Sequence, residues 1–275
     1  MQPPSERILL FIPMYNCERQ IPRVAAQLTA EVRACLTEII VVNNLSRDGS
    51  ESAAIEAFAA IEQPRVKVLR NDENYGLGCS HKVAFNYAIA NGFDYCIVLH
   101  GDDQEDIRNM APLLLSGVHR TVDCLLGARF MPGSQIKGYS WFRRLGNHVF
   151  NVIYSCVAGR RIYDLGSGLN LYSVKALSDR GYLRHANDLT FNYHMILHSI
   201  AAGWRIRFFP IVWREDDQIS NVKLLRQSLR VLAIVVDYAF CRARYLSVDH
   251  SGLPGGTYTS AVVFDSATTG VAAIC

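Results

Sequence analysis

The sequence predicts an α/β fold with a mainly parallel central sheet and helices on both of its faces. Within the first hundred residues, short apolar runs alternate three times with stretches of helical periodicity, and a fourth apolar run follows. Strand–helix units in tandem imply right-handed crossovers, which make the strands parallel and cover both faces of the sheet. With 275 residues, half of them hydrophobic, the chain is long enough to bury one large core.

The first two strand–helix units occupy residues 8–61. Residues 8–12 form a compact apolar run closed by Pro13, which cannot continue a central strand ladder. Ile21, Val24, Leu28 and Val32 recur at helical spacing, so we expect one helix over 18–35. A second strand over 38–42 ends in two asparagines, and the N-cap chemistry of the loop 46–50 opens a helix that runs through residue 61.

The third strand–helix unit leads to a fourth strand, which ends in the polar turn at residues 100–104. Pro64 breaks the preceding helix, and a strand over 66–69 is followed by the glycine-punctuated loop 71–78. The expected third helix covers 80–90 and stops at Asn91-Gly92. The fourth strand, 95–99, follows. Because parallel strands end at one edge of a sheet, we expect function at the carboxyl ends of these four strands.

The second half of the chain has a less regular pattern. We expect strands over 122–126 and 204–212, a Gly/Pro/Ser loop over 131–139, and helices over 141–157, 174–180, 189–202 and 224–242. We divide the chain into a main domain (1–225), a helical extension (226–250) and a tail of low order (251–275).

Composition excludes several classes of protein. Only 19% of the residues are charged and the net charge is +3, which excludes an intrinsically disordered chain and a protein that coats nucleic acid. The eight cysteines include no C-x-x-C pair, which leaves no readable zinc site or redox dithiol. We find no signal peptide, and no apolar stretch reaches the roughly 18–20 residues of a membrane span. We therefore expect a cytoplasmic protein.

The turn after the fourth strand, His100-Gly101-Asp102-Asp103-Gln104, is a candidate metal site. Asp102 can hold a divalent cation, with Gln104 as a neutral oxygen ligand and Asp103 turned away or supporting the site from behind. The alternative is an Asp-rich turn that caps a helix starting near Glu105. Position at the carboxyl end of a parallel strand favours the metal, Mg²⁺ or Mn²⁺, and with it a phosphorylated ligand. His100 can serve as a soft ligand or a base, although a lone histidine at a strand end is more typically a structural, hydrogen-bonded residue.

Two common nucleotide-binding α/β folds are excluded by their missing glycines. A dinucleotide-binding domain needs G-x-G-x-x-G after the first strand, but residues 13–18 contain no glycine. Gly76-x-Gly78 comes two units later and has no third glycine, and a Walker loop is also absent from the sequence. The remaining interpretation is a nucleotide pocket built from side chains and a metal.

Four motifs in order resemble glycosyltransferase family 2. They are Phe11-Ile12-Pro13-Met14-Tyr15-Asn16-Cys17-Glu18, Val41-Val42-Asn43-Asn44-Leu45-Ser46-Arg47-Asp48-Gly49-Ser50, Asn71-x-x-Asn74-x-Gly76-x-Gly78, and Gly101-Asp102-Asp103-Gln104. The resemblance covers residues 7–225 and implies the GT-A fold, a nucleotide-sugar-binding domain with a DxD-type metal motif. It implies a donor site that includes Pro13, Tyr15, Asn16, Glu18, Asn44, Asn74 and Gly76.

The downstream half is similar to the polyprenyl-phosphate glycosyltransferases of the dolichyl-phosphate mannose synthase type. The similarity lies in Gly127-Ala128-Arg129-Phe130, Trp141 with Arg143-Arg144, Asp164-x-x-Ser167-Gly168, and Arg214 followed by Ser220 and Lys223. It implies metal-dependent, inverting transfer of a sugar from a nucleotide diphosphate to a dolichyl or undecaprenyl phosphate, for cell envelope polysaccharide synthesis. A place at the inner face of the membrane follows from such an acceptor.

This resemblance implies a role for each matched residue. The catalytic set would be Asp102, Arg129, Arg143, Asp164 and Arg214. Asp102 and Gln104 would bind the metal, Arg129, Arg143 and Asn147 the acceptor phosphate, and Arg214 and Lys223 the donor diphosphate. Arg143 and Asn147 stand at i and i+4 and can reach one phosphate from a helix, although a solvated helix face is the commoner fate of such a pair.

Two departures from the family pattern leave alternatives open. Asn43-Asn44 replaces the usual acids, and His100 stands where the first acid of DxD is expected. One alternative is a transferase that uses a polysaccharide or soluble hydroxyl acceptor, which needs a general base such as Asp164 or Asp188. The other is a nucleotide-sugar binding module without turnover.

Overall fold

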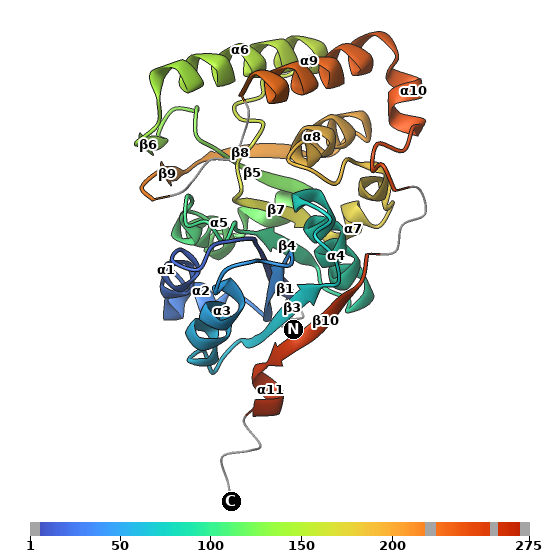
Figure 1. Ribbon diagram of the computed structural model, residues 1–275. Helices are drawn as coiled ribbons and strands as arrows, with labels where there is room; N and C mark the ends of the chain where they lie inside the picture. The colour runs from blue at the N-terminus through green and yellow to red at the C-terminus, as the bar shows by residue number, and fades with distance from the viewer. Residues whose placement is uncertain (1–5, 218–223, 254–257, 270–275) are drawn as a thin grey trace, which may run out of the picture.

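A mixed sheet forms the centre of the molecule in the computed structural model, which describes residues 6–217, 224–253 and 258–269. Within these residues eight strands lie in the order β10-β3-β2-β1-β4-β7-β5-β8, with helices on both faces (Figure 1). The strands are β1 (Ile8–Met14), β2 (Glu38–Asn43), β3 (Arg65–Asn71), β4 (Tyr95–Val98), β5 (Cys124–Ala128), β7 (Asn170–Ser173), β8 (Ile206–Pro210) and β10 (Ser260–Asp265). The predicted α/β class is confirmed.

The four strands of the first half are parallel, and their carboxyl ends meet at one edge of the sheet. β1 pairs with β2 and β4, and β2 pairs with β3. β1 runs two residues further than expected, through Pro13. Pro13 has no N–H to donate, but the strand continues because the backbone carbonyls here still have partners. The Pro13 carbonyl accepts a hydrogen bond from Gly101 N at 3.0 Å, and the Met14 carbonyl accepts one from Asn44 N at 2.9 Å. The turns after β1, β2 and β4 therefore adjoin one another.

The second half departs from the parallel pattern. β7 lies antiparallel between β4 and β5, and β8 then pairs in parallel with β5. We expected no strand over 170–173, because four residues are too few to show a period. A second, two-stranded sheet joins β6 (Gln135–Lys137) to β9 (Val212–Arg214). The loop expected over 131–139 thus contains a strand, and the strand expected over 204–212 is divided into β8 and β9.

Helices pack on both faces of the sheet because its inner strands are apolar on both sides. Leu9 and Phe11 of β1 join one hydrophobic core, while Ile8, Leu10 and Ile12 join the other. The helices are α1 (Ile21–Ala26), α2 (Ala30–Ala34), α3 (Ser50–Ala59), α4 (Leu77–Ala90), α5 (Ala111–Leu115), α6 (Trp141–Ala158), α7 (Val174–Leu177), α8 (Phe191–Ala201), α9 (Leu224–Phe240), α10 (Arg242–Ser247) and α11 (Ser266–Thr269), with short 3₁₀ turns at Ile107–Asn109, Val118–Thr121 and Gly181–Arg184.

Two expected helices are each divided in the structure. The helix predicted over 18–35 is α1 followed by α2, because the Thr29 side chain accepts a hydrogen bond from Val32 N and starts a new helix. The closing helix ends at Phe240, and α10 follows. Val231 and Val235 of α9 belong to the same core as Phe11, so the expected extension 226–250 packs onto the main domain.

The tail expected to be of low order contributes the last strand of the sheet. β10 pairs antiparallel with β3, and Arg65 Nε donates to Asp265 Oδ1 at 2.9 Å across that pair. One short strand at a sheet edge gives too weak an alternation to be seen in the sequence. In the part of the chain that the structure describes, no helix is both long and apolar enough to cross a membrane.

Candidate active site

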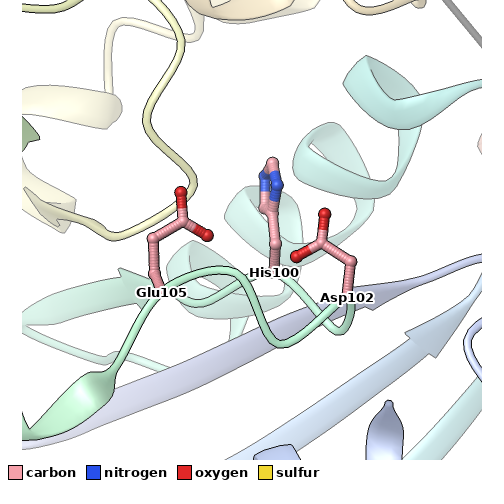
Figure 2. Close-up of side chains that lie close together, drawn as sticks. All are labelled: His100, Asp102 and Glu105. Atoms are coloured by element: carbon pink, nitrogen blue, oxygen red, sulfur yellow. The ribbon is translucent and has the colours of Figure 1, made fainter. Parts of the chain in front are cut away.

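Three side chains of the turn after β4 converge on one point. His100, Asp102 and Glu105 each offer a ligand atom, and these atoms all lie within 4.8 Å of one another. Figure 2 shows the three side chains extending to the same side of the turn. The turn lies tightly against β1, because a Cβ at Gly101 would approach Pro13 O to 2.9 Å. Two carboxylates and an imidazole form a donor set that suits a divalent metal.

The polar atoms of this cluster support the fit of a cation. Glu105 Oε1 accepts a hydrogen bond from Gly168 N at 2.8 Å, but Glu105 Oε2 and His100 Nε2 are buried without a hydrogen-bond partner among the described residues. Burial raises the pKa of the Glu105 carboxyl, and the charge of Asp102 adds to the shift. Burying unpaired polar atoms is costly, and a bound cation would satisfy both atoms while favouring the ionised carboxylates.

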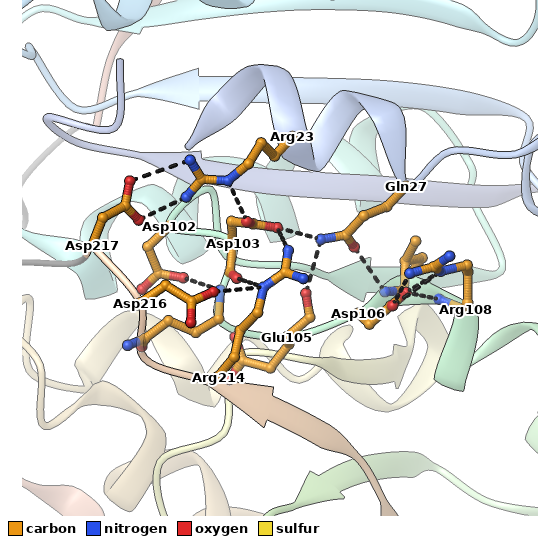
Figure 3. Close-up of polar contacts among 12 residues, drawn as sticks. Arg23, Gln27, Asp102, Asp103, Glu105, Asp106, Arg108, Arg214, Asp216 and Asp217 are labelled. Carbon is orange, nitrogen blue, oxygen red and sulfur yellow. Dashed lines mark hydrogen bonds and ion pairs between the residues drawn. The ribbon is translucent and has the colours of Figure 1, made fainter. Parts of the chain in front are cut away.

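Asp103 faces away from this cluster and is fixed by two arginines. Its carboxylate, which is fully buried, accepts hydrogen bonds from Arg23 Nε at 2.7 Å, from Gln27 Nε2 at 2.7 Å and from Arg214 (Figure 3). Its φ of 60° is in the left-handed region, which is uncommon for a residue with a side chain but occurs most often for Asn, Asp and His. The expectation that Asp103 supports the site from behind agrees with these contacts.

Arg214 holds the strand β9 to the same turn. Its backbone N donates to Gln104 O at 2.9 Å and its Nε donates to Asp103 O at 3.0 Å. Asp217 pairs with Arg23 at 2.7 Å and so links the segment after β9 to α1. The structure thus places Arg214 beside the candidate metal turn, and its role at the donor diphosphate stays a prediction. Ser220 and Lys223 lie outside the described residues.

Arg129 and Asp164 form a buried, bidentate ion pair. Arg129 Nε and Nη2 donate to the two carboxylate oxygens of Asp164, each at 2.7 Å, and the backbone N of Arg129 donates at 2.8 Å. Both side chains are nine-tenths or more buried. Asp164, the candidate general base of the hydroxyl-acceptor alternative, and Arg129, predicted at the acceptor phosphate, therefore neutralise one another.

Tyr139 lies between two predicted acceptor residues. The guanidinium carbon of Arg143 lies 4.3 Å from the centre of the Tyr139 ring, and that of Arg129 lies 5.9 Å from it. Asn147 Nδ2 donates to the Tyr139 hydroxyl at 2.9 Å, and Arg143 Nη1 also pairs with Glu215 at 2.6 Å. The three residues predicted to bind the acceptor phosphate are thus gathered around one tyrosine.

The predicted donor residues lie in two groups at the carboxyl edge of the sheet. In the first, the buried Asn44 donates to Asn74 Oδ1 at 2.8 Å and accepts from Asn71 at 3.1 Å. Gly76, with a φ of 90°, lets this loop approach the chain at residue 187, where a Cβ would lie 2.5 Å from a backbone oxygen. The Asn43 side chain instead donates to Glu51 of α3.

The second group joins the turn after β1 to the loop before α3. Arg47 N donates to Asn16 Oδ1 at 2.9 Å, and Gly49 N donates to Glu18 Oε2 at 3.2 Å. Tyr15 is exposed at the same turn, which leaves its ring accessible. Pro13 ends β1 beside Gly101, so this group adjoins the candidate metal turn.

Comparison with known proteins identifies the family. The sequence model of "Glycosyl transferase family 2" matches residues 10–181, more than half of the chain. The chain belongs to glycosyltransferase family 2. This family assignment and the architecture agree, and the protein is a glycosyltransferase with the GT-A fold.

Two curated relatives of this glycosyltransferase extend over most of both chains. Polyprenol monophosphomannose synthase of Mycolicibacterium smegmatis is 24% identical over 223 residues, which are 78% of this chain and 80% of the relative. Undecaprenyl-phosphate mannosyltransferase of Micrococcus luteus is 25% identical over 219 residues, which are 77% and 85%. Glucosyl-3-phosphoglycerate synthase of Mycobacterium tuberculosis, crystallised with Mn²⁺, UDP and phosphoglyceric acid, shares the fold with a TM-score of 0.62 at 15% identity, covering 95% of this chain and 89% of that one.

Sequence reasoning missed several residues of this glycosyltransferase site. The sequence pattern predicts that a helix starts near Glu105, but the position of Glu105 three residues after Asp102 is a usable signal for a second carboxylate on the turn. Arg23 and Glu215 are ion-pair partners from distant segments, and Tyr139 seemed only to end a loop. Gln104 remains a predicted metal ligand, and the structure brings Asp102 together with His100 and Glu105 as a group that could hold the metal.

Proposed function

We propose that this glycosyltransferase moves a sugar, with inversion, from a nucleotide-diphosphate donor to a polyprenyl phosphate. The names of the two curated relatives support a lipid phosphate acceptor. The structural observation that carries the proposal is the ion pair between Arg129 and Asp164. A carboxylate held by two hydrogen bonds from an arginine is a poor general base, and an acceptor that is already an anionic phosphate needs none.

The other carboxylate considered as a base is also engaged. Asp188 accepts from Thr190 N at 2.8 Å and pairs with Arg230 of α9 at 2.6 Å. A hydroxyl acceptor would need one of these acids to take up a proton during the reaction. Their pairing with arginines favours the phosphate acceptor over the polysaccharide or soluble hydroxyl.

In the proposed reaction, the arginines and amides of the chain bind and orient two phosphate-bearing substrates. Arg143 and Asn147 bind the acceptor phosphate beside Tyr139, and Arg214 with Lys223 binds the donor diphosphate. Arg143 would then exchange its pair with Glu215 for the phosphate, to which guanidinium offers two parallel donors. The amide of Asn44 both donates and accepts, so it can bind a nucleobase edge.

The residues of the turn after β4 would hold a divalent cation, Mg²⁺ or Mn²⁺. His100, Asp102 and Glu105 converge there, and Gln104 is the additional ligand that the sequence predicts. When bound, the cation supplies positive charge against the diphosphate that leaves. With a lipid phosphate as acceptor, we propose that the protein works at the cytoplasmic face of the membrane.

Release of nucleotide diphosphate tests the proposal. The protein is incubated with Mg²⁺ or Mn²⁺, a panel of nucleotide sugars, and either a short-chain polyprenyl phosphate or soluble glycans. We expect release only with the lipid phosphate and only with metal. Release with soluble glycans would establish the hydroxyl acceptor instead, and binding without release in every combination would establish a binding module.

A further inference from the structure

The outer faces of α6 and α9 carry many exposed apolar side chains. The two helices lie side by side at the end of the molecule opposite α11 (Figure 1). Ten large apolar residues on them are between 41% and 84% exposed. We call this set the α6–α9 face; it consists of Trp141, Phe142, Leu145, Val149, Val152, Leu225, Leu229, Leu232, Val236 and Phe240.

The exposed residues form a stripe along each helix. On α9 they recur three or four residues apart from Leu225 to Phe240, so they share one side of the helix. The opposite side packs into the core through Val231 and Val235, and Tyr154 of α6 donates a hydrogen bond to Val231 O at 2.9 Å. Each helix therefore has one apolar side in the core and another in solvent. Large exposed apolar side chains gathered on two neighbouring helices are typical of a binding surface.

Arginines surround the α6–α9 face and acids are nearly absent from it. Residues 141–161 contain four arginines and no acid, and residues 224–244 contain four arginines and one acid. That acid, Asp237, pairs with Arg244, and acids from other segments pair with Arg143 (Glu215) and Arg230 (Asp188). The remaining arginines form no salt bridge within the described residues, so they leave the face positively charged; they are Arg144, Arg160, Arg161, Arg226 and Arg242. The combination of apolar stripes with arginines along their margins is typical of helices that lie in the plane of a membrane surface.

We propose that the α6–α9 face docks onto the surface of an anionic lipid bilayer. The positive charge of the α6–α9 face favours an anionic bilayer as its partner over a second copy of the chain. Two copies joined through this face would bring their arginines together, and such like-charge juxtaposition is unfavourable. Anionic headgroups instead complement the arginines while the apolar stripes enter the headgroup–acyl boundary. Trp141 and Phe142, at the start of α6, would enter that boundary first.

Docking in this way would bring the proposed acceptor site to the headgroups. Arg143 and Asn147 lie on the first two turns of α6, on the side that contacts Tyr139 and not on the exposed stripe. A docked α6 would hold this site next to the headgroups, within reach of a lipid phosphate that extends past the helix. This point rests on the proposed function, whereas docking itself does not and is measured without either substrate.

Vesicle sedimentation tests docking with the full chain. The vesicles are phosphatidylcholine alone, or phosphatidylcholine with phosphatidylglycerol, and they contain no polyprenyl phosphate. We expect binding to the anionic vesicles, weakened by salt. The double variant Leu145→Gln/Leu229→Gln should reduce the partition coefficient by at least about tenfold. The matched control is Leu115→Gln on α5, a leucine that is 63% exposed outside the α6–α9 face and should partition like the wild type.

Three results would overturn docking. The first is failure of the wild type to bind anionic vesicles, and the second is equal binding by the double variant. The third is a dimer in solution that the double variant converts to a monomer, which would make the face a self-interface. Vesicle binding without sugar transfer would reject the proposed function and support docking. Sugar transfer to a short, water-soluble acceptor phosphate should be unchanged in the double variant.

Discussion

Arg129 and Asp164 share two hydrogen bonds of 2.7 Å inside the protein, where both side chains are nine-tenths or more buried. Asp164→Asn would leave the arginine buried without its counter-charge. We expect a loss of about 3–5 kcal/mol in the free energy of unfolding, measured by urea denaturation. Asp123→Asn breaks a pair with the exposed Arg205 and should cost about 1 kcal/mol or less. Equal losses in the two variants would contradict the assigned role.

The metal ligands can be separated by comparing three conservative variants. Asp102→Asn and Glu105→Gln each remove a carboxylate from the convergent cluster, so Mn²⁺ affinity in the presence of nucleotide diphosphate should fall by more than about tenfold. Gln104→Ala tests the additional ligand predicted from the sequence. Titration calorimetry measures the affinity. Asp106→Asn, at an acid that pairs with the exposed Arg108, is the control. Unchanged affinity in Glu105→Gln would remove Glu105 from the site.

Gly168 controls the position of His100. A Cβ at Gly168 would lie 2.4 Å from His100 Cγ, so Gly168→Ala must displace the imidazole or the loop. We expect Mn²⁺ affinity and turnover to fall together. Gly146→Ala is the matched control, because nothing lies within 4 Å of a Cβ there and its helix should gain about 0.5–1 kcal/mol. Normal metal binding in Gly168→Ala would show that this close approach has no functional consequence.

Asp103→Asn should separate the turn from its two arginines. The buried carboxylate lies against Arg23 and Arg214, and an amide pairs with them less strongly. We expect KM for the nucleotide sugar to rise several-fold, because Arg214 loses its orientation. Asp217→Asn, at a partly exposed partner of Arg23, should have the smaller effect. An unchanged KM in Asp103→Asn would show that Arg214 is positioned by other contacts.

His194 makes the fold sensitive to acid. Burial lowers the pKa of His194 to about 3, with the nearby His250 adding to the shift. An unfolded chain takes up this proton near pH 6.5, so the contribution is complete above pH 6.5 and is lost as the pH falls toward 3. His194→Gln should reduce the slope of unfolding free energy against pH, between pH 6 and 4.5, by about 1.4 kcal/mol per pH unit. His148→Gln, at an exposed histidine, should leave the slope unchanged.

The sequence predicted the parts of the site that depend on local pattern. The apolar runs of β1, β2 and β4 are continuous because both faces of each strand are covered, and the polar ends of the parallel strands met at one edge as expected. Asp102 was found because it follows such a run. The helical spacing of Arg143 and Asn147 placed them on one face of α6.

The parts of the fold and of the site that the sequence did not predict depend on contacts between distant segments. Asp103 finds Arg23 and Arg214 at sequence separations of 80 and 111 residues, which no local pattern indicates. Glu105 gains its fixed position from Gly168, which precedes the unexpected antiparallel strand β7. β7 and β10 are short, and their place in the sheet is decided by the neighbours that need pairing rather than by their own sequence.

The pairing of β10 with β3 also affects how the protein emerges from the ribosome. β3 forms the outer edge of the parallel half of the sheet and is made early in translation, yet the strand that pairs with this edge, residues 260–265, is made much later. An open strand edge can pair with other chains, and nascent domains stay exposed until their partner segments are made. Protection of this edge until residue 265 has emerged, for example by a chaperone, should therefore govern the yield of folded enzyme.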